Sequence, residues 1–342
     1  MEDVIRVHDQ FYILATSSLA DNRTRVLKHG ETFAVFDPYG DIQSLGLGEQ
    51  GIYHEGTRFL SRLLLCVGRS RPLFLSSTVK DDNVLLVVDL TNPDLMSNER
   101  VIVPRGTLHI CRTKFLWEGA CYERLRIFNY GLSPIDMPLS LQFDADFADI
   151  FEVRGLRREH RGQRLEGIVE DGSIHLAYEG LDGVVRRTRL ECCPRPTEAS
   201  GSELRFEVRL PPKGELTFYV TVSCESAPGV APRLPFDVAA AEAEHALKLA
   251  RNEDCEIYTS NEQFNDWLNR SIADLHMMIT DTPNGVYPYA GVPWFSTAFG
   301  RDGIITALEC LWVNPGIARG VLVILGRDPS HGDHPRAGCR AR

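Results

Sequence analysis

The stretch at residues 287–303, YPYAGVPWFSTAFGRDG, joins aromatic rings to a charged pair. Flat rings such as those of Trp294 and Phe299 can cover the apolar face of a pyranose. Arg301 and Asp302 can form charge-assisted hydrogen bonds with the sugar hydroxyls. Two prolines and three glycines favour a loop over a helix or strand. These residues by themselves leave two interpretations open: a sugar-binding loop, or an aromatic core loop in which Asp302 is the N-cap of the next helix.

The elements that must position this loop are helices, expected over residues 237–325. An Ala-rich helix begins with Asp237 as its N-cap and runs to about residue 249. Ser260 and Gln263 have the spacing of a capping box before a second helix. Its apolar residues recur at steps of three and four, as on one face of a helix: Phe264, Trp267, Leu268, Ile272, Leu275, Met278 and Ile279.

A third helix is expected over about residues 302–313, directly after the loop, and Asn314-Pro315 is an N-cap and N1 pair that starts a fourth. The apolar stripe of the third helix is Ile304, Ile305, Leu308, Leu311 and Trp312. The last 17 residues, GRDPSHGDHPRAGCRAR at 326–342, have no large apolar residue, so we expect a disordered tail there.

Residues 1–226 have the pattern of strands rather than helices. Short runs rich in Val, Ile, Leu, Phe, Tyr and Thr alternate with turn residues, and residues 58–67 are one such run. About a dozen strands predict a large antiparallel β-sandwich. A Pro-rich segment at 227–236 marks the boundary with the helices. The expected fold class is therefore mainly β with a helical C-terminal part, and the sandwich is expected to fold as a unit.

Composition limits the partners and the compartment. The formal net charge is −10 and no basic stripe is present, which argues against nucleic acid as a partner. The N-terminus lacks the pattern of a signal peptide, and no apolar run approaches the 18 residues of a membrane span. Nine scattered Cys without a C-x-x-C pair predict reduced thiols in a cytoplasmic protein. The sequence implies no cofactor and no metal, and it is compatible with a homo-oligomer.

Two further motifs have a functional and a structural interpretation. Asp144, Asp146 and Asp149 could suggest calcium, but they lack the glycine and distal glutamate of an EF-hand loop, so a polar loop that closes a strand is favoured. The segment at residues 54–58, HEGTR, could reach across to a sugar site, and a hydrogen-bonded structural turn is the favoured alternative.

Residues 288–312, PYAGVPWFSTAFGRDGIITALECLW, resemble the loop-plus-helix segment of bacterial and archaeal glycogen-debranching enzymes of the amylo-α-1,6-glucosidase type. These are six-hairpin glycosidases. The strand-forming half resembles the same family in the segments GETFAVFD (30–37), GIYHEGTRFLS (51–61), DLTNPDL (89–95), YERLRIFN (122–129) and FDADFADIFEVRG (143–155). The resemblance covers about residues 11–325.

The resemblance implies a β-sandwich packed against an (α/α)6 toroid that carries the glycosidase site. It also implies that Trp294, Arg301 and Asp302 line the subsite for the non-reducing-end glucose of an α-1,6 branch. Twelve helices with their loops need on the order of 300 residues or more, whereas about 90 follow the linker. The acid and base of the family are then expected beyond this chain, which would be a truncated portion, inactive alone. Asp302 and Glu309 share one helix face, but a substrate-positioning Asp and a surface Glu are the better account of that pair.

Two functions of different classes remain at this point. The first is the N-terminal portion of a glycogen-debranching glycoside hydrolase acting on α-1,6-linked branches of glycogen or limit dextrin. The alternative is a non-catalytic β-sandwich module that binds glucan or a protein partner.

Overall fold

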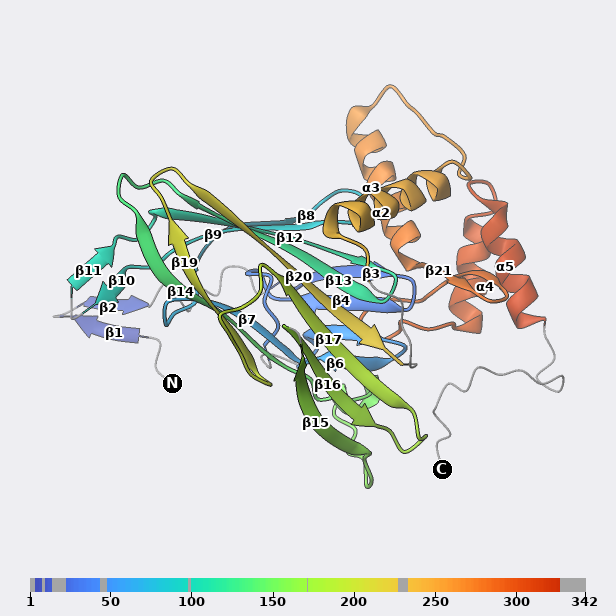
Figure 1. Cartoon of the computed structure of the whole chain (residues 1–342). Helices are drawn as coiled ribbons and strands as arrows, with labels where there is room; N and C mark the ends of the chain where they lie inside the picture. Colours follow the sequence, from blue (N-terminus) through green and yellow to red (C-terminus); the bar gives the residue numbers. More distant parts are fainter. Residues whose placement is uncertain are drawn as a thin grey trace.

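The computed structural model describes residues 4–7, 10–13, 23–43, 48–97, 100–170, 172–226 and 233–326. We call residues 23–226 the strand-rich part and residues 233–326 the helical part (Figure 1). Residues 227–232 of the expected linker and 327–342 of the expected tail lie outside the described residues.

The strands before the helical part form antiparallel pairs throughout. Their bounds are β1 (Val4–Val7), β2 (Gln10–Ile13), β3 (Arg25–His29), β4 (Thr32–Phe36), β5 (Gly51–His54), β6 (Thr57–Leu60), β7 (Arg62–Val67), β8 (Leu73–Val79), β9 (Leu86–Thr91), β10 (Leu95–Ser97), β11 (Arg100–Val103), β12 (Leu108–Trp117), β13 (Ala120–Asn129), β14 (Ile135–Asp144), β15 (Gln163–Glu170), β16 (Ser173–Glu179), β17 (Val185–Cys193), β18 (Glu198–Ala199), β19 (Glu203–Leu210) and β20 (Glu215–Glu225).

Three larger sheets organise these strands. One has eight strands in the order β15-β16-β17-β20-β13-β12-β9-β8, and two have four strands, β18-β19-β14-β7 and β3-β4-β5-β6. The expected dozen strands was too few, in part because residues 58–67 are not one strand. Ser61 separates β6 from β7, which belong to different sheets. The sequence does not reveal this change of sheet, because the residues on both sides of Ser61 are mostly apolar.

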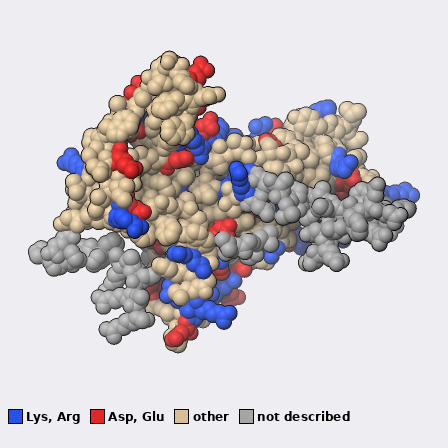
Figure 2. Space-filling model, turned by 180° about the vertical axis from the view of Figure 1, so that it is seen from behind, with Lys and Arg blue, Asp and Glu red and all other residues tan. Residues whose placement is uncertain are grey.

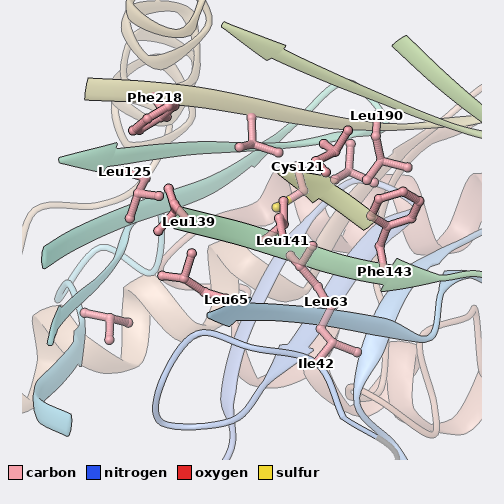
Figure 3. Packing of buried hydrophobic residues seen from close by; sticks show 14 of the residues in the cluster. Ile42, Leu63, Leu65, Cys121, Leu125, Leu139, Leu141, Phe143, Leu190 and Phe218 are labelled. Atoms are coloured by element: carbon pink, nitrogen blue, oxygen red, sulfur yellow. The ribbon is translucent and has the colours of Figure 1, made fainter. Parts of the chain in front are cut away.

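The main core lies between the eight-stranded sheet and the four-stranded sheet β18-β19-β14-β7. Leu125 and Phe218 from the first sheet belong to the same buried cluster as Leu65 and Leu141 from the second (Figure 3). Strand β19 shows why this packing follows from the sequence, because its buried and exposed residues alternate along ELRFEVRL. The predicted β-sandwich is therefore confirmed.

A buried ionic network lies inside the strand-rich part. The Arg112 guanidinium, fully buried on β12, contacts Asp41 at 2.5 Å and Glu123 at 2.6 Å. Lys114 pairs with the same Glu123 carboxylate. Arg71 contacts Asp41 at 2.7 Å. Burying charges is costly unless they are paired and hydrogen-bonded, and here cations and carboxylates alternate.

The helical part contains α2 (Phe236–Arg251), α3 (Glu262–Met278), α4 (Gly300–Glu309) and α5 (Pro315–Leu325), with the hairpin of β21 (Ile279–Thr282) and β22 (Gly285–Pro288) between α3 and α4. A further short helix, α1 (Ile150–Val153), lies in the strand-rich part. Helix α2 lies beside the eight-stranded sheet (Figure 1). Its residue Phe236 meets the ring of Phe115 on β12 edge-on, with centroids 5.1 Å apart. The predicted fold class, mainly β with a helical C-terminal part, is confirmed.

Several predicted helix caps were wrong, and one was right. Pro235 is the N-cap residue of α2, so Asp237 lies in the first turn instead. Asn261, not the box of Ser260 and Gln263, caps α3. The N-cap of α4 is Phe299, because the helix begins at Gly300, two residues before Asp302. The Asn314-Pro315 pair starts α5 as predicted, with the Asn314 side chain accepting from Gly316 N.

Much of the apolar surface of the helices faces solvent in this chain. Trp267 on α3 is 65% exposed, and Trp312, just after α4, is 67% exposed. Phe264, Ile304, Ile305, Leu308 and Leu311 are exposed as well. The predicted third helix is shorter than expected, because α4 ends at Glu309 and Leu311 and Trp312 lie after it. The apolar residues of the helices are only partly covered.

On the face shown in Figure 2, basic and acidic side chains of the described residues are interspersed rather than gathered by sign. Among the described helices, none is long and apolar enough to cross a membrane.

Candidate functional site

The predicted sugar-binding loop connects the β21–β22 hairpin to α4. Its backbone is held by its own hydrogen bonds, because Phe295 N donates to Gly291 O at 2.8 Å and Gly291 N to Phe295 O at 3.2 Å. Tyr289 N donates to Met278 O at 3.0 Å, which fixes the start of the loop to the end of α3. Backbone hydrogen bonds therefore define the turn of the loop and join its start to the end of α3.

Tyr287 anchors the far end of the loop. Its ring is fully buried and its hydroxyl donates a 2.8 Å hydrogen bond to Phe299 O. Gly303 makes this approach possible, since a Cβ there would lie 2.3 Å from the Tyr287 hydroxyl. Burial, and next the charge of Asp302, raise the pKa of Tyr287, so the hydroxyl stays protonated as a donor. These contacts fix where α4 begins and hence where Arg301 and Asp302 stand.

The strand-rich part forms the seat of the loop. The Tyr289 hydroxyl donates to Glu31, which follows β3. Val292 packs against the buried cluster that contains Phe33 and Tyr53. Those two rings stack with their centroids 4.5 Å apart, and together they form an apolar surface of the sheet β3-β4-β5-β6.

The rings of the loop are grouped at its outer side. Phe295 and Phe299 meet edge-on with centroids 5.8 Å apart, and they are 46% and 38% exposed. Trp294 is partly buried. The Arg154 guanidinium lies 5.9 Å from the Trp294 ring centroid and 5.4 Å from that of Phe295. Exposed ring faces beside a cation can receive the apolar face of a sugar.

The charged pair stands in the first turn of α4. Arg301 Nε lies 3.8 Å from Asp302 Oδ2, and the Arg301 side chain is 82% exposed. Because Asp302 is not the N-cap residue, the interpretation of Asp302 as a helix cap is wrong. Phe299, Arg301 and Asp302 thus stand together at the start of α4, whereas Glu309 is the last residue of the helix and is exposed.

Two residues of this cluster were not among the predicted site residues. Phe295 lies within the aromatic stretch and had the same signal as Trp294. The sequence signal for Arg154 was weaker. Arg154 belongs to the segment FDADFADIFEVRG, which resembles the family but lies 140 residues before the loop. Contact between Arg154 and the loop depends on how the helical part docks on the sheets, which spacing along the chain does not reveal.

Each of the three aspartates at residues 144–149 forms an ion pair with an arginine. Asp144 pairs with Arg164 at 2.5 Å and Asp146 with Arg58 at 2.5 Å. Asp149 caps α1 and pairs with Arg158 at 2.7 Å. Within the described ranges, no group of three or more His, Cys, Asp or Glu could hold a metal ion. These contacts match the interpretation of a polar loop that closes a strand.

The HEGTR segment forms a tight turn. Glu55 and Gly56 have φ values of 48° and 75°, and Glu55 N donates to Glu31 O at 3.2 Å. His54 shares a 2.8 Å hydrogen bond with Thr32, and burial chiefly lowers the pKa of His54. These bonds match the interpretation of a structural turn.

A cleft of about 1020 Å³ lies between the two parts of the molecule. Its lining includes His29, Glu31 and Trp117 from the strands and His276 and Asn314 from the helical part. Trp294, Phe299, Arg301 and Asp302 are not among its lining residues. The predicted sugar-contacting residues therefore lie outside this cleft.

Comparison with solved structures shows which known folds the chain resembles. A human-microbiome protein assigned as a kojibiose phosphorylase aligns with 87% of this chain at a TM-score of 0.57 and 11% identity. A bacterial glucoamylase solved with acarbose aligns with 88% at a TM-score of 0.50 and 11% identity. The chain spans 45% and 49% of those two chains. At this identity the likeness shows the fold alone: a β-sandwich followed by helices, as in the matched portions of these two proteins.

Sequence comparison then gives the family. No curated protein sequence matches the chain. Residues 27–221, more than half of the chain, match the N-terminal domain of (some) glycogen debranching enzymes, and the chain belongs to that family. The predicted resemblance is therefore confirmed.

Proposed function

We propose that this chain binds the ends of α-glucans such as glycogen or limit dextrin, as the N-terminal portion of a glycogen-debranching glycoside hydrolase that acts on α-1,6-linked glucose branches. The observation that carries the proposal is that two exposed rings at the end of the loop are followed directly by a charged pair in the first turn of α4. Phe295 and Phe299 offer ring faces, and Arg301 and Asp302 follow directly on α4. Family membership and the glucoamylase-like fold support a glucan as the ligand.

Asp302 has a defined part in this proposal. Its carboxylate can accept two hydroxyl hydrogen bonds from the terminal glucose, and Arg301 can donate to a third oxygen. Trp294 and Phe299 supply the apolar platform. The pair of Arg301 and Asp302 is loose, at 3.8 Å, so both groups can turn toward a ligand.

We further propose that residues 1–342 by themselves bind glucan without cleaving it. Glycoside hydrolysis requires two carboxyl groups on either side of the scissile bond. Asp302 lies in the first turn of α4, three residues after Phe299, while Glu309 is at the opposite end of the helix. A second carboxylate at bonding distance from a sugar on the rings would have to come from elsewhere.

The alternative function, a non-catalytic module that binds a protein partner, is favoured by the exposed apolar side chains of α3 and α4. Both proposals are separated by one set of measurements. Titration calorimetry with limit dextrin tests binding, and release of glucose from the same dextrin tests cleavage. We expect binding without glucose release. Binding that is unchanged in the double variant Trp294→Ala, Asp302→Asn would contradict the assigned site, and no binding by the wild type would contradict the function.

We propose that residues 1–226 fold as one unit in the cytoplasm. The free state of the described cysteines supports a reducing compartment.

A further inference from the structure

We infer that Arg154, which the strand-rich part contributes, is a positioning residue of the glucan-binding loop. Its guanidinium holds the rings of Trp294 and Phe295 and offers hydrogen-bond donors beside them. The inference rests on the proposed function, since it concerns the same glucan. It goes further by making the site composite, with one wall from each part of the molecule.

The first support is the way the fold fixes Arg154. The residue ends helix α1, where Asp149 accepts from Phe151 N at 2.8 Å and from Glu152 N at 3.0 Å. Arg154 N donates to Ile150 O at 3.1 Å, and Gly155 follows with a φ of 101°. A short helix with a capping box and a left-handed exit holds the backbone of Arg154 in one place.

The second support is a shared apolar seat. Ile150 and Val153 of α1 pack against the cluster of Phe33, Val35 and Tyr53, and Val292 of the loop packs against the same cluster. Helix α1 and the loop are therefore neighbours on one surface. This explains how a side chain 140 positions earlier in the chain reaches the rings.

The third support is a contrast with the other arginines of this region. Arg158, Arg161 and Arg164 pair with Asp149, Glu152 and Asp144. No described ion pair involves Arg154, whose contacts are the two rings. These three arginines are thus neutralised by carboxylates, whereas the Arg154 guanidinium lies against the rings of the loop.

The chemistry of the guanidinium group suits the proposed role of Arg154 beside the rings and the sugar. A cation within about 6 Å of a ring centroid is attracted by the electron-rich face of the ring. Arginine also carries five N–H donors in a planar fork, so contact with rings leaves donors along its edge. A glucose stacked on the rings would find these donors at the level of its hydroxyl oxygens.

The test uses the full chain and limit dextrin as the probe. Calorimetry compares the wild type with Arg154→Ala and Arg154→Lys. The control is Arg157→Ala, which changes an exposed arginine in the segment that follows α1. We expect Arg154→Ala to weaken binding about 5- to 10-fold and Arg157→Ala to leave it unchanged. Arg154→Lys should recover part of the loss, because an ammonium keeps the charge over the rings but lacks the planar fork.

A second readout follows the rings without any ligand. Acrylamide quenching of tryptophan fluorescence, with Trp294→Phe to identify the contribution of Trp294, reports the cover over that ring. We expect stronger quenching of Trp294 in Arg154→Ala and near-wild-type quenching in Arg154→Lys, with unchanged thermal unfolding. Equal binding and equal quenching in the wild type and Arg154→Ala would overturn the inference alone. A wild-type chain that does not bind dextrin would overturn the proposed function and the ligand part of this inference with it.

Discussion

The Lys28 ammonium, on strand β3, donates a 2.6 Å hydrogen bond to the hydroxyl of Thr280, 252 residues later in the chain. Both residues are buried. The same ammonium lies 5.1 Å from the ring centroid of Tyr289, whose hydroxyl donates to Glu31. These contacts join the strand-rich part to the start of the candidate loop, so the loop is positioned by the sheet as well as by its own helices.

This junction predicts a specific pH dependence. Burial outweighs the attraction of Glu31 and lowers the pKa of Lys28 from 10.5 to about 8. Between those two values the unfolded chain binds more protons at Lys28 than the folded chain does, so the free energy of unfolding rises with pH across this window. The rise is at most about 3 kcal/mol. Urea unfolding of the wild type and Lys28→Met between pH 7.5 and 10.5 isolates this contribution. Parallel curves for the two proteins would show that Lys28 does not carry it.

The buried ionic network predicts a large loss of stability when Glu123 is removed. Burial would raise the pKa of Glu123, but Arg112 and Lys114 outweigh burial and lower the pKa to about 2. Glu123→Gln leaves two buried cations without their shared carboxylate, which we expect to cost about 3–5 kcal/mol. The effect should shrink below about pH 4, because the stability from Glu123 is lost as pH falls toward its folded pKa. Denaturant unfolding at pH 7 and pH 3 provides the measurement, and a loss under 1 kcal/mol at pH 7 would contradict the pairing.

Gly303 predicts a steric effect on the loop. The added methyl group of Gly303→Ala would meet the Tyr287 hydroxyl at 2.3 Å, so either the ring or the start of α4 must move. We expect a loss of about 1–3 kcal/mol and weaker glucan binding. Gly291→Ala is the matched control, since no atom lies within 4 Å of the added carbon there. Equal thermal unfolding of the two variants would argue against the anchoring part of Tyr287.

A substitution of Asp302 distinguishes a role in ligand binding from a role in helix capping. Because Phe299 is the N-cap residue of α4, Asp302→Asn should leave thermal stability nearly unchanged while it weakens limit-dextrin binding about 10-fold. In a relative that hydrolyses α-1,6 branches, we expect the matching change to lower kcat/KM at least ~10²-fold. A variant that loses stability but keeps its affinity would assign Asp302 to the fold instead.

Hydrogen exchange should distinguish the two parts of the molecule. Strands β12 and β13 are paired along their whole length and their apolar residues lie in the core, so their amides should exchange slowly. Helices α3 and α4 expose Trp267, Ile304 and Leu308, which leaves them less stabilised by burial. We expect their amides to exchange faster by orders of magnitude. Equal protection in both parts, in a monomer, would show that the exposed stripes do not limit the stability of the helices.

The sequence by itself determined the class of the fold and most of the residues of the candidate site. Alternating apolar residues such as those of β19 can bury one face only in a sheet, and a 3.6-residue period such as that of α3 can bury one face only in a helix. Proline and glycine predicted a loop over residues 287–303, and its central residues 289–299 do lie between β22 and α4. Local patterns of this kind suffice because the backbone period is a local property.

The tertiary structure alone decided which residues meet. Helix caps depend on where packing starts a helix, so the buried Tyr287 and the close approach of Gly303 set the start of α4 at Gly300 rather than at Asp302. Arg154 reaches Trp294 only because α1 and the loop share one apolar seat on the sheet β3-β4-β5-β6. Contacts between distant segments follow from the packing of whole surfaces, which no local pattern in the chain encodes.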